Sequence, residues 1–175
     1  MQPAPYWIEE FRHRMSGLGP APAPDQIPVS IKIRVESGCF HREHSPEAYR
    51  LIDRHLATQR LESKGVRFEE HESGPEILLY VAATTAGLSL AKSIIDLVVA
   101  IIKARSEGIK RGDGPRHPVE LIVRRIDENG DYAEEKILRI PPEHEVDVNE
   151  VASKLLQPPP RAKKKRAETK KSKAR

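Results

Sequence analysis

Alternating apolar and polar positions mark the first strand that the chain predicts. Residues 28–37 read PVSIKIRVES, in which Ile31, Ile33 and Val35 are separated by polar residues. This period of two is typical of a half-buried strand. A shorter segment of the same kind, VRFEEH, occupies residues 66–71 and predicts a second strand.

A hairpin is predicted further along the chain. The segments VELIVRRI and YAEEKILRI both have strand-like composition, and they flank the short segment DENGD. Within it, Asn129 and Gly130 suit the positive φ angles of a tight turn. Two antiparallel strands joined at this turn are therefore expected, and Pro141 and Pro142 end the second of them.

A period of 3.6 residues predicts a helix in SPEAYRLIDRHLATQRLESKG. Tyr49, Ile52 and Leu56 fall on one face of this helix, with Ser45 as the expected N-cap and Pro46 as the first helical residue.

The last periodic segment, VNEVASKLL, predicts a final helix. Asp147 precedes it as an N-cap, and Glu150 three residues later completes a capping box. Val148, Val151 and Leu155 are expected to face the core.

The most apolar part of the chain is residues 77–105, ILLYVAATTAGLSLAKSIIDLVVAIIKAR. We interpret it as one long helix that ends near Gly108. On such a helix the polar residues form a single stripe, typical of a buried helix with a thin solvent seam. This stripe comprises Thr85, Ser89, Lys92, Asp96 and Lys103.

The same stretch has a transmembrane alternative. A spanning helix needs roughly 20 mostly apolar residues, and residues 77–102 have that length. Lys92 and Asp96 lie near the middle of this range, where each charge costs about 2.5 to 3.5 kcal/mol on insertion scales. We therefore prefer the buried helix of a cytoplasmic domain and keep a single-span membrane protein as an alternative.

Small residues repeat every four positions along the predicted helix, at Ala83, Gly87 and Ala91. Such a face permits close packing on a sheet, on a partner protein or on a second copy. Because the apolar surface is large for so small a domain, we expect a homo-oligomer or an effector complex to cover it.

These elements predict an α+β domain in the order β-α-β-α-β-β-α. It would have a mixed sheet of about four strands, one long central helix and two shorter ones, with the helices over one face. The expected organisation is a docking peptide and linker at 1–27, a globular domain at 28–156, and a disordered tail rich in Lys and Arg at 157–175.

The N-terminal segment predicts a short apolar helix that a linker tethers to the domain. Trp7, Ile8 and Phe11 are at helical spacing, and the linker after them is rich in Ala and Pro, a composition that favours extended chain. Such a helix is a candidate docking peptide for a partner groove. The alternative is that it folds back onto its own domain.

Charge divides the chain unevenly. Residues 161–175 hold nine Lys or Arg against one Glu, whereas residues 1–160 carry a net charge of −4. A basic tail without aromatic residues would contact phosphate backbones without recognising base sequence. The alternative function is thus a nucleic-acid-associated protein whose contacts are Lys163, Lys164, Lys165, Arg166, Lys170 and Lys171. An acidic membrane surface, an acidic protein or no partner at all would also suit this tail.

Two segments carry candidate chemistry. CFHREH brings together Cys39, His41 and His44, which are suitable zinc ligands, but a second pair of closely spaced ligands is missing. RGDGPRHP, residues 111–118, is basic and contains glycine but lacks the spacing of a phosphate-binding loop. We therefore predict no catalytic residue, no metal and no cofactor, and a protein that is not an enzyme.

The order of elements resembles the effector-associated constant component family of bacterial conflict and defence systems. The resemblance covers about residues 28–156: an opening strand SIKIRVES, a charged helix, a second strand, a long helix ending in VVAIIKARSEGIKR, a hairpin and a last helix. It implies a non-catalytic adaptor, in a conflict or antiviral defence system, that couples a sensor or protease-like effector to its partners. No catalytic residue carries over from it.

Overall fold

The structure is a computed structural model, and it describes residues 6–16, 26–38, 40–59, 66–70, 76–84, 92–126 and 132–156. Within this part of the chain the elements are α1 (Tyr6–Ser16), β1 (Gln26–Val35), α2 (Pro46–Thr58), β2 (Val66–Glu70), β3 (Glu76–Thr84), α3 (Lys92–Lys110), β4 (Val119–Ile126), β5 (Tyr132–Ile140) and α4 (Val148–Leu156).

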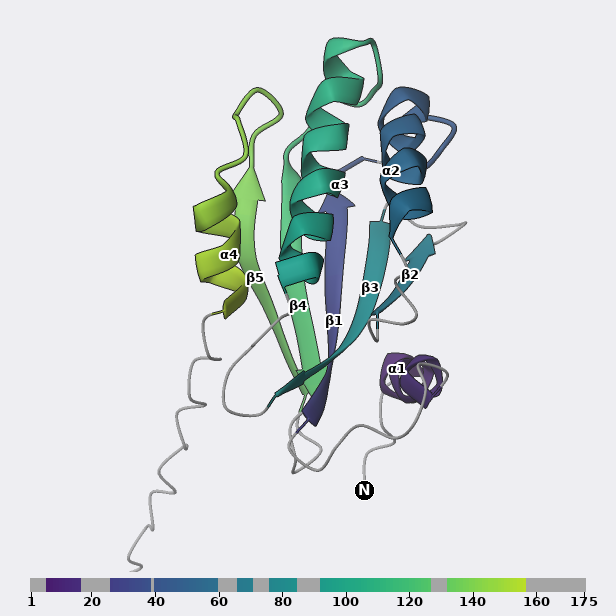
Figure 1. Ribbon diagram of the computed structural model, residues 1–175, viewed down its shortest axis with the longest axis vertical. Coiled ribbons are helices and arrows are strands. Elements are labelled where there is room, and N and C mark those ends of the chain that lie inside the picture. Colours follow the sequence, from purple (N-terminus) through teal and green to yellow (C-terminus); the bar gives the residue numbers. More distant parts are fainter. Residues whose placement is uncertain are drawn as a thin grey trace, which may run out of the picture.

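The five strands form one sheet in the order β2-β3-β1-β4-β5, with β1 at its centre (Figure 1). Every pairing is antiparallel. Helix α2 connects β1 to β2, and β3 lies between these two strands in the sheet. Helix α3 connects β3 to β4, which have β1 between them. This is the split βαββαβ topology of ferredoxin-like domains, extended by β5 at one edge and by α4.

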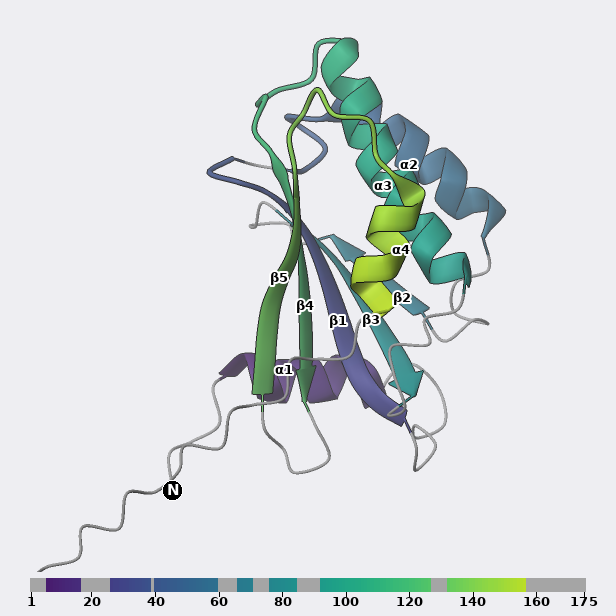
Figure 2. The same ribbon diagram turned by 90° about the vertical axis from the view of Figure 1, so that its left-hand side faces the viewer.

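Helices cover both faces of the sheet. Figure 2 shows α2, α3 and α4 together on one side of the sheet, while α1 lies across the strands at their lower end in this view. Along β3, Leu79 and Val81 belong to the core under α2, α3 and α4, whereas Leu78 and Tyr80 pack with α1. Because successive side chains of a strand point to opposite faces, α1 lies on the face away from the other three helices.

The α+β class is confirmed, but the sheet has five antiparallel strands and is not a mixed sheet of four. The prediction of one long helix over residues 77–105 was wrong. The structure forms strand β3 first and helix α3 afterwards. Residues 77–81 are all buried, because β3 lies between β1 and β2 and is covered on both faces. Such a strand is apolar at every position, and its sequence resembles that of a buried helix.

Helix α3 keeps part of the predicted polar stripe. Lys92, Asp96 and Lys103 are exposed, while most of the other α3 side chains are buried against the sheet, α2 and α4. The predicted seam is therefore confirmed for these three residues. Thr85 and Ser89 lie outside the described residues.

The shorter helices follow their predicted faces with one exception. Tyr49 and Ile52 of α2 are buried, as are Val151 and Leu155 of α4, but Val148 is 39% exposed. Val148 is the first residue of α4, and its side chain lies beyond the edge of the helical layer. The predicted cap of α4 is confirmed, since Asp147 Oδ1 accepts a hydrogen bond from the backbone N–H of Asn149 at 2.8 Å.

Candidate functional site

Helix α1 forms a small apolar contact with the sheet. Ile8 and Phe11 are buried against Leu78 and Tyr80 of β3 and Ile126 of β4. The rings of Phe11 and Tyr80 are tilted, with centroids 5.8 Å apart. These two α1 side chains therefore occupy an apolar surface that three sheet residues provide.

Polar contacts border this apolar surface. Arg14 pairs with Glu69 of β2 at 3.1 Å and with Glu10 at 3.6 Å. Arg67 Nη1 donates a hydrogen bond to the backbone carbonyl of Arg14 at 3.4 Å. Burial raises the pKa of Tyr80, and the nearby carboxylate of Glu69 raises it further. The C-terminal part of α1 is thus held at the rim of the contact by one ion pair and one hydrogen bond to β2.

A buried carboxylate lies on the same face of the sheet, on β4. Glu120 is almost fully buried, and it accepts hydrogen bonds from Arg34 Nε at 2.6 Å and from Lys136 Nζ. Burial by itself would raise the pKa of Glu120, but the hydrogen bonds from Lys136 and Arg34 outweigh burial and lower it. Three charged side chains are therefore joined across β1, β4 and β5 on this face.

The two segments with candidate chemistry come together at the other end of the molecule. The backbone N–H of Gly114 donates to the carbonyl of His44 at 3.1 Å, and Glu36 N–H donates to the carbonyl of Pro118 at 2.9 Å. Ser45 Oγ donates to the carbonyl of Gly114 at 3.3 Å. We call this contact between residues 36–45 and 111–118 the loop junction.

Asp113 caps helix α2 from within the loop junction. Its carboxylate accepts hydrogen bonds from the backbone N–H groups of Glu47 at 3.1 Å and Ala48 at 2.9 Å. Ser45, the predicted N-cap, makes no such side-chain bond. Gly108 admits this arrangement, because a Cβ there would lie 2.2 Å from Asp113 Oδ2 and 2.9 Å from the backbone nitrogen of Ala48. Sequence analysis missed this role, since the two segments are more than sixty positions apart.

Arg105 lies under the same junction and is 1% exposed. Its Nη2 donates to the carbonyl of Pro115, and its guanidinium lies over the ring of Phe40, 5.6 Å from the centroid. Nε and Nη1 have no hydrogen-bond partner among the described residues. Burial lowers the pKa of Arg105, and Asp113 opposes that shift. Asp113 therefore compensates both the α2 N-terminus and a buried cation.

The loop before α2 gathers three side chains that are suitable metal ligands. Donor atoms of His41, Glu43 and His44 all lie within 4.8 Å of one another. His41 Nε2 and His44 Nδ1 are 3.1 Å apart. Beside them is an open pocket of about 570 Å³, lined by Glu43, His44, Pro46, Gly112, Asp113, Gly114 and Pro115. The placement of Cys39 lies outside the described residues.

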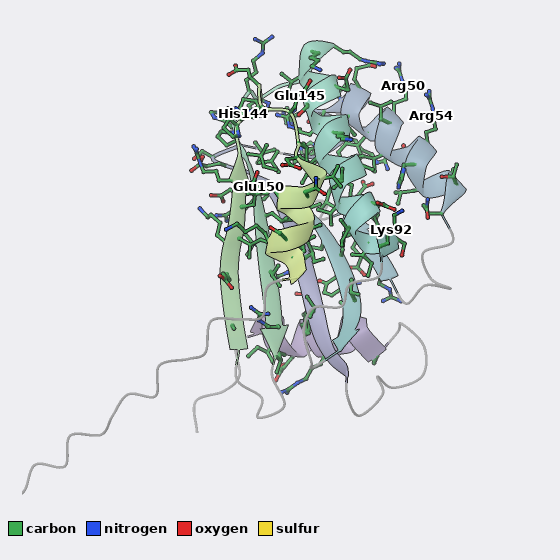
Figure 3. The ribbon with its side chains drawn as sticks, turned by 60° about the vertical axis from the view of Figure 1, so that its left-hand side comes forward. Arg50, Arg54, Lys92, His144, Glu145 and Glu150 are labelled. Atoms are coloured by element: carbon green, nitrogen blue, oxygen red, sulfur yellow. The ribbon has the colours of Figure 1, made fainter. Side chains whose placement is uncertain are left out.

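A second pocket, of about 300 Å³, lies between the end of α3 and the segment before α4. Lys103 and Lys110 line it on one side and Glu143, His144 and Glu145 on the other. Figure 3 shows His144, Glu145 and Glu150 on this side of the helical layer, with Arg50 and Arg54 on α2 at the opposite side. The pocket thus brings lysines of α3 close to carboxylates of the segment before α4.

The sequence-predicted interaction residues are placed in different ways. Ile8 and Phe11 face the chain's own sheet, and Trp7 lies in α1 with its side chain outside the described part. The small-residue helix face was a wrong prediction, because Ala83 lies in strand β3, in register with Ile27 of β1.

The other predicted contacts of that face, Gly87 and Ala91, lie outside the described residues. So do the tail residues Lys163, Lys164, Lys165, Arg166, Lys170 and Lys171. The nucleic-acid contact of the tail therefore stays a prediction.

None of the described helices combines the length and the hydropathy that a membrane span requires. The 19-residue helix α3 is the longest of them. The segment predicted as an alternative span, residues 77–102, contains nearly all of strand β3 and the first part of α3.

Comparisons with known proteins give no relative. No protein-family model matches the chain, and neither the curated proteins nor the solved structures contain a significant match. The resemblance to the effector-associated constant component family is thus neither supported nor contradicted.

Proposed function

We propose that the protein is a non-enzymatic interaction module that binds a protein partner through the sheet surface that α1 covers. The role of an adaptor within a defence effector complex, which the family resemblance implies, is part of this proposal. The observation that carries it is the small contact of α1 with Leu78, Tyr80 and Ile126.

Helix α1 needs a partner surface to be stable. It has 11 residues, and isolated helices shorter than about 12 to 15 residues are marginal in water. Its apolar residues Ile8 and Phe11 are therefore paired either with the chain's own sheet or with another protein. A partner helix with apolar side chains at the same spacing would meet the same three sheet residues.

The remaining described surface favours this site over others. Val148 is the one large hydrophobic side chain that is exposed among the described residues. While α1 is docked, this part of the chain thus offers no apolar patch of the size that protein interfaces use. Release of α1 would uncover Leu78, Tyr80 and Ile126 together.

The test compares binding of a labelled peptide of residues 6–16 to the full chain and to its Ile8→Ala/Phe11→Ala variant. Because the variant's own α1 competes less, the peptide should bind it at least about tenfold more tightly than the wild type. Glu9→Ala is the matched control, since Glu9 is on the exposed side of α1. Adding Leu78→Asp to the double variant should abolish binding.

Equally weak binding to the wild type, to the Ile8→Ala/Phe11→Ala variant and to the variant that also carries Leu78→Asp would contradict the proposal. Size-exclusion chromatography with light scattering tests whether the partner is a second copy of the chain. A wild-type dimer that becomes monomeric in the Ile8→Ala/Phe11→Ala variant would show that α1 binds the sheet of a second copy.

A further inference from the structure

We propose that His41, Glu43 and His44 form a binding site for a divalent metal ion of the zinc class, with the fourth position open toward the pocket beside the loop junction. This site goes beyond the interaction proposed for α1, and it lies on different elements.

The ligand set is the first argument. Imidazole nitrogen and carboxylate oxygen are ordinary zinc ligands, and zinc can be held by three protein ligands with a fourth, exchangeable position. All three donor atoms lie within 4.8 Å of one another on one loop. Two nitrogens bound tetrahedrally to one zinc would be about 3.3 Å apart, and His41 Nε2 and His44 Nδ1 are 3.1 Å apart.

The loop also holds these ligands in place. Phe40 is fully buried, and its carbonyl accepts a hydrogen bond from the hydroxyl of Tyr49 at 3.0 Å. On the other side Ser45 is fully buried, and its backbone N–H donates to the carbonyl of His41 at 3.0 Å. Gly114 fixes the carbonyl of His44. The three ligands are therefore carried by a segment anchored at both ends, which reduces the entropy lost when they bind an ion.

The surroundings leave room for the ion and a further ligand. The 570 Å³ pocket is lined by Glu43 and His44. Asp113, the other carboxylate in that pocket, already accepts two backbone hydrogen bonds at the start of α2. Glu43 is exposed, so its carboxylate can turn toward the two imidazoles. The fourth position would take water or a side chain of a bound protein.

Two local contacts must change when the ion binds. His44 Nδ1 and His41 Nε2 share a hydrogen bond of 3.1 Å, which coordination of both nitrogens to the ion would replace. His41 Nδ1 accepts a hydrogen bond from the backbone N–H of Glu43 at 3.2 Å. A neutral imidazole that ligates through Nε2 carries its proton on Nδ1, so this contact would be broken. The amide of Glu43 thus reports binding at this site.

The experiment titrates the full chain, prepared without a histidine tag, with Co²⁺ and then displaces it with Zn²⁺. One equivalent of Co²⁺ should give the intense visible absorption of a tetrahedral ion, and Zn²⁺ should remove it. In the same titration the amide resonance of Glu43 should shift. The single variants His41→Ala and His44→Ala should each bind at least about tenfold more weakly.

The chain offers a matched control in a second Glu-His pair. The variant Glu43→Gln/His44→Ala should lose Co²⁺ binding, whereas Glu143→Gln/His144→Ala should keep it, because Glu143 and His144 belong to no three-ligand group among the described residues. Circular dichroism checks that each variant is folded.

Three results would overturn the proposal. The first is a folded wild type that does not give the tetrahedral spectrum. The second is binding that the variant at residues 143 and 144 loses and the variant at 43 and 44 keeps. The third is binding that Cys39→Ser abolishes while His41→Ala and His44→Ala retain it.

Discussion

On one face of the sheet, the core that the strands form with α2, α3 and α4 contains 25 buried apolar residues of the described chain, whereas the contact with α1 on the other face contains five. Because the hydrophobic free energy grows with the apolar area removed from water, the face under the three helices dominates the stability of the domain. The α1 face contributes little to it. We therefore expect that α1 can detach while the rest of the domain stays folded.

Two neighbouring leucines of β3 provide the sharpest test of this difference. Leu79 is buried under α2 and α3, and Leu78 is buried under α1. We expect Leu79→Ala to lower the free energy of unfolding by about 3 to 5 kcal/mol, the usual cost of a large cavity in a rigid core. Leu78→Ala should cost less than about 2 kcal/mol, because α1 can move to fill the space. Urea denaturation measures both, and equal losses would contradict the comparison.

The next largest effect is expected for the polar groups on the side of the sheet that α2, α3 and α4 cover. Asp113→Ala removes the acceptor of two α2 N–H groups and the compensating charge of buried Arg105, and we expect a loss of about 2 kcal/mol. Asp147→Ala is the matched control, because this exposed cap of α4 accepts one bond and should cost about 1 kcal/mol. Thermal unfolding followed by circular dichroism distinguishes the two. A loss at Asp113 no larger than that at Asp147 would show that Arg105 does not depend on Asp113.

The buried carboxylate on the α1 face should have a pH signature. Because the folded-state pKa of Glu120 is lowered, its contribution is fully present above the unfolded-state pKa of about 4.3 and is lost as the pH falls through the lower folded-state pKa. We expect Glu120→Gln to cost about 1 to 2 kcal/mol at neutral pH.

Urea denaturation between pH 7 and pH 3 checks this expectation. The gap between wild type and Glu120→Gln should narrow on acidification, while Glu143→Gln, at an exposed site, should follow the wild type throughout. A gap that stays constant with pH would mean that the charge of Glu120 is not stabilising.

The smallest effect is expected at the rim of α1. Glu69→Gln removes the partner of Arg14, and a partly exposed ion pair of this kind contributes about 0.2 to 1 kcal/mol. The loss should be visible as faster hydrogen exchange in α1, with unchanged exchange in α3. Glu9→Gln, on the exposed side of α1, is the control. Faster exchange in α3 as well would show that α1 does not open independently.

Local patterns were sufficient for the elements that are covered on one side. The strand β1 alternates because one of its faces meets the main core, and Ile31, Ile33 and Val35 are accordingly buried there. The helices α2 and α4 also agree with their sequence periods. Strands β4 and β5 agree with their strand-like composition, although β4 is buried at nearly every position. These elements are enough to predict the α+β class.

The candidate sites were less accessible to sequence analysis. His41 and His44 are visible as an isolated cluster, but their proximity to the 111–118 segment depends on how α3 returns the chain to β4. Asp113 caps a helix that begins more than sixty residues earlier. No local pattern encodes such a pairing, since it results from the packing of Gly108 against Ala48.

The sequence by itself thus determined which segments are periodic, where charge accumulates and that the domain is α+β. Only the tertiary structure decided the conformation of residues 77–84 and 92–105. An apolar run is equally compatible with a buried helix and with a strand covered on both faces. No interaction within the segment itself favours one of the two conformations. Residues 76–84 become a strand because β1 and β2 provide hydrogen-bonding edges on both sides, while the helical layer and α1 remove both of its faces from water.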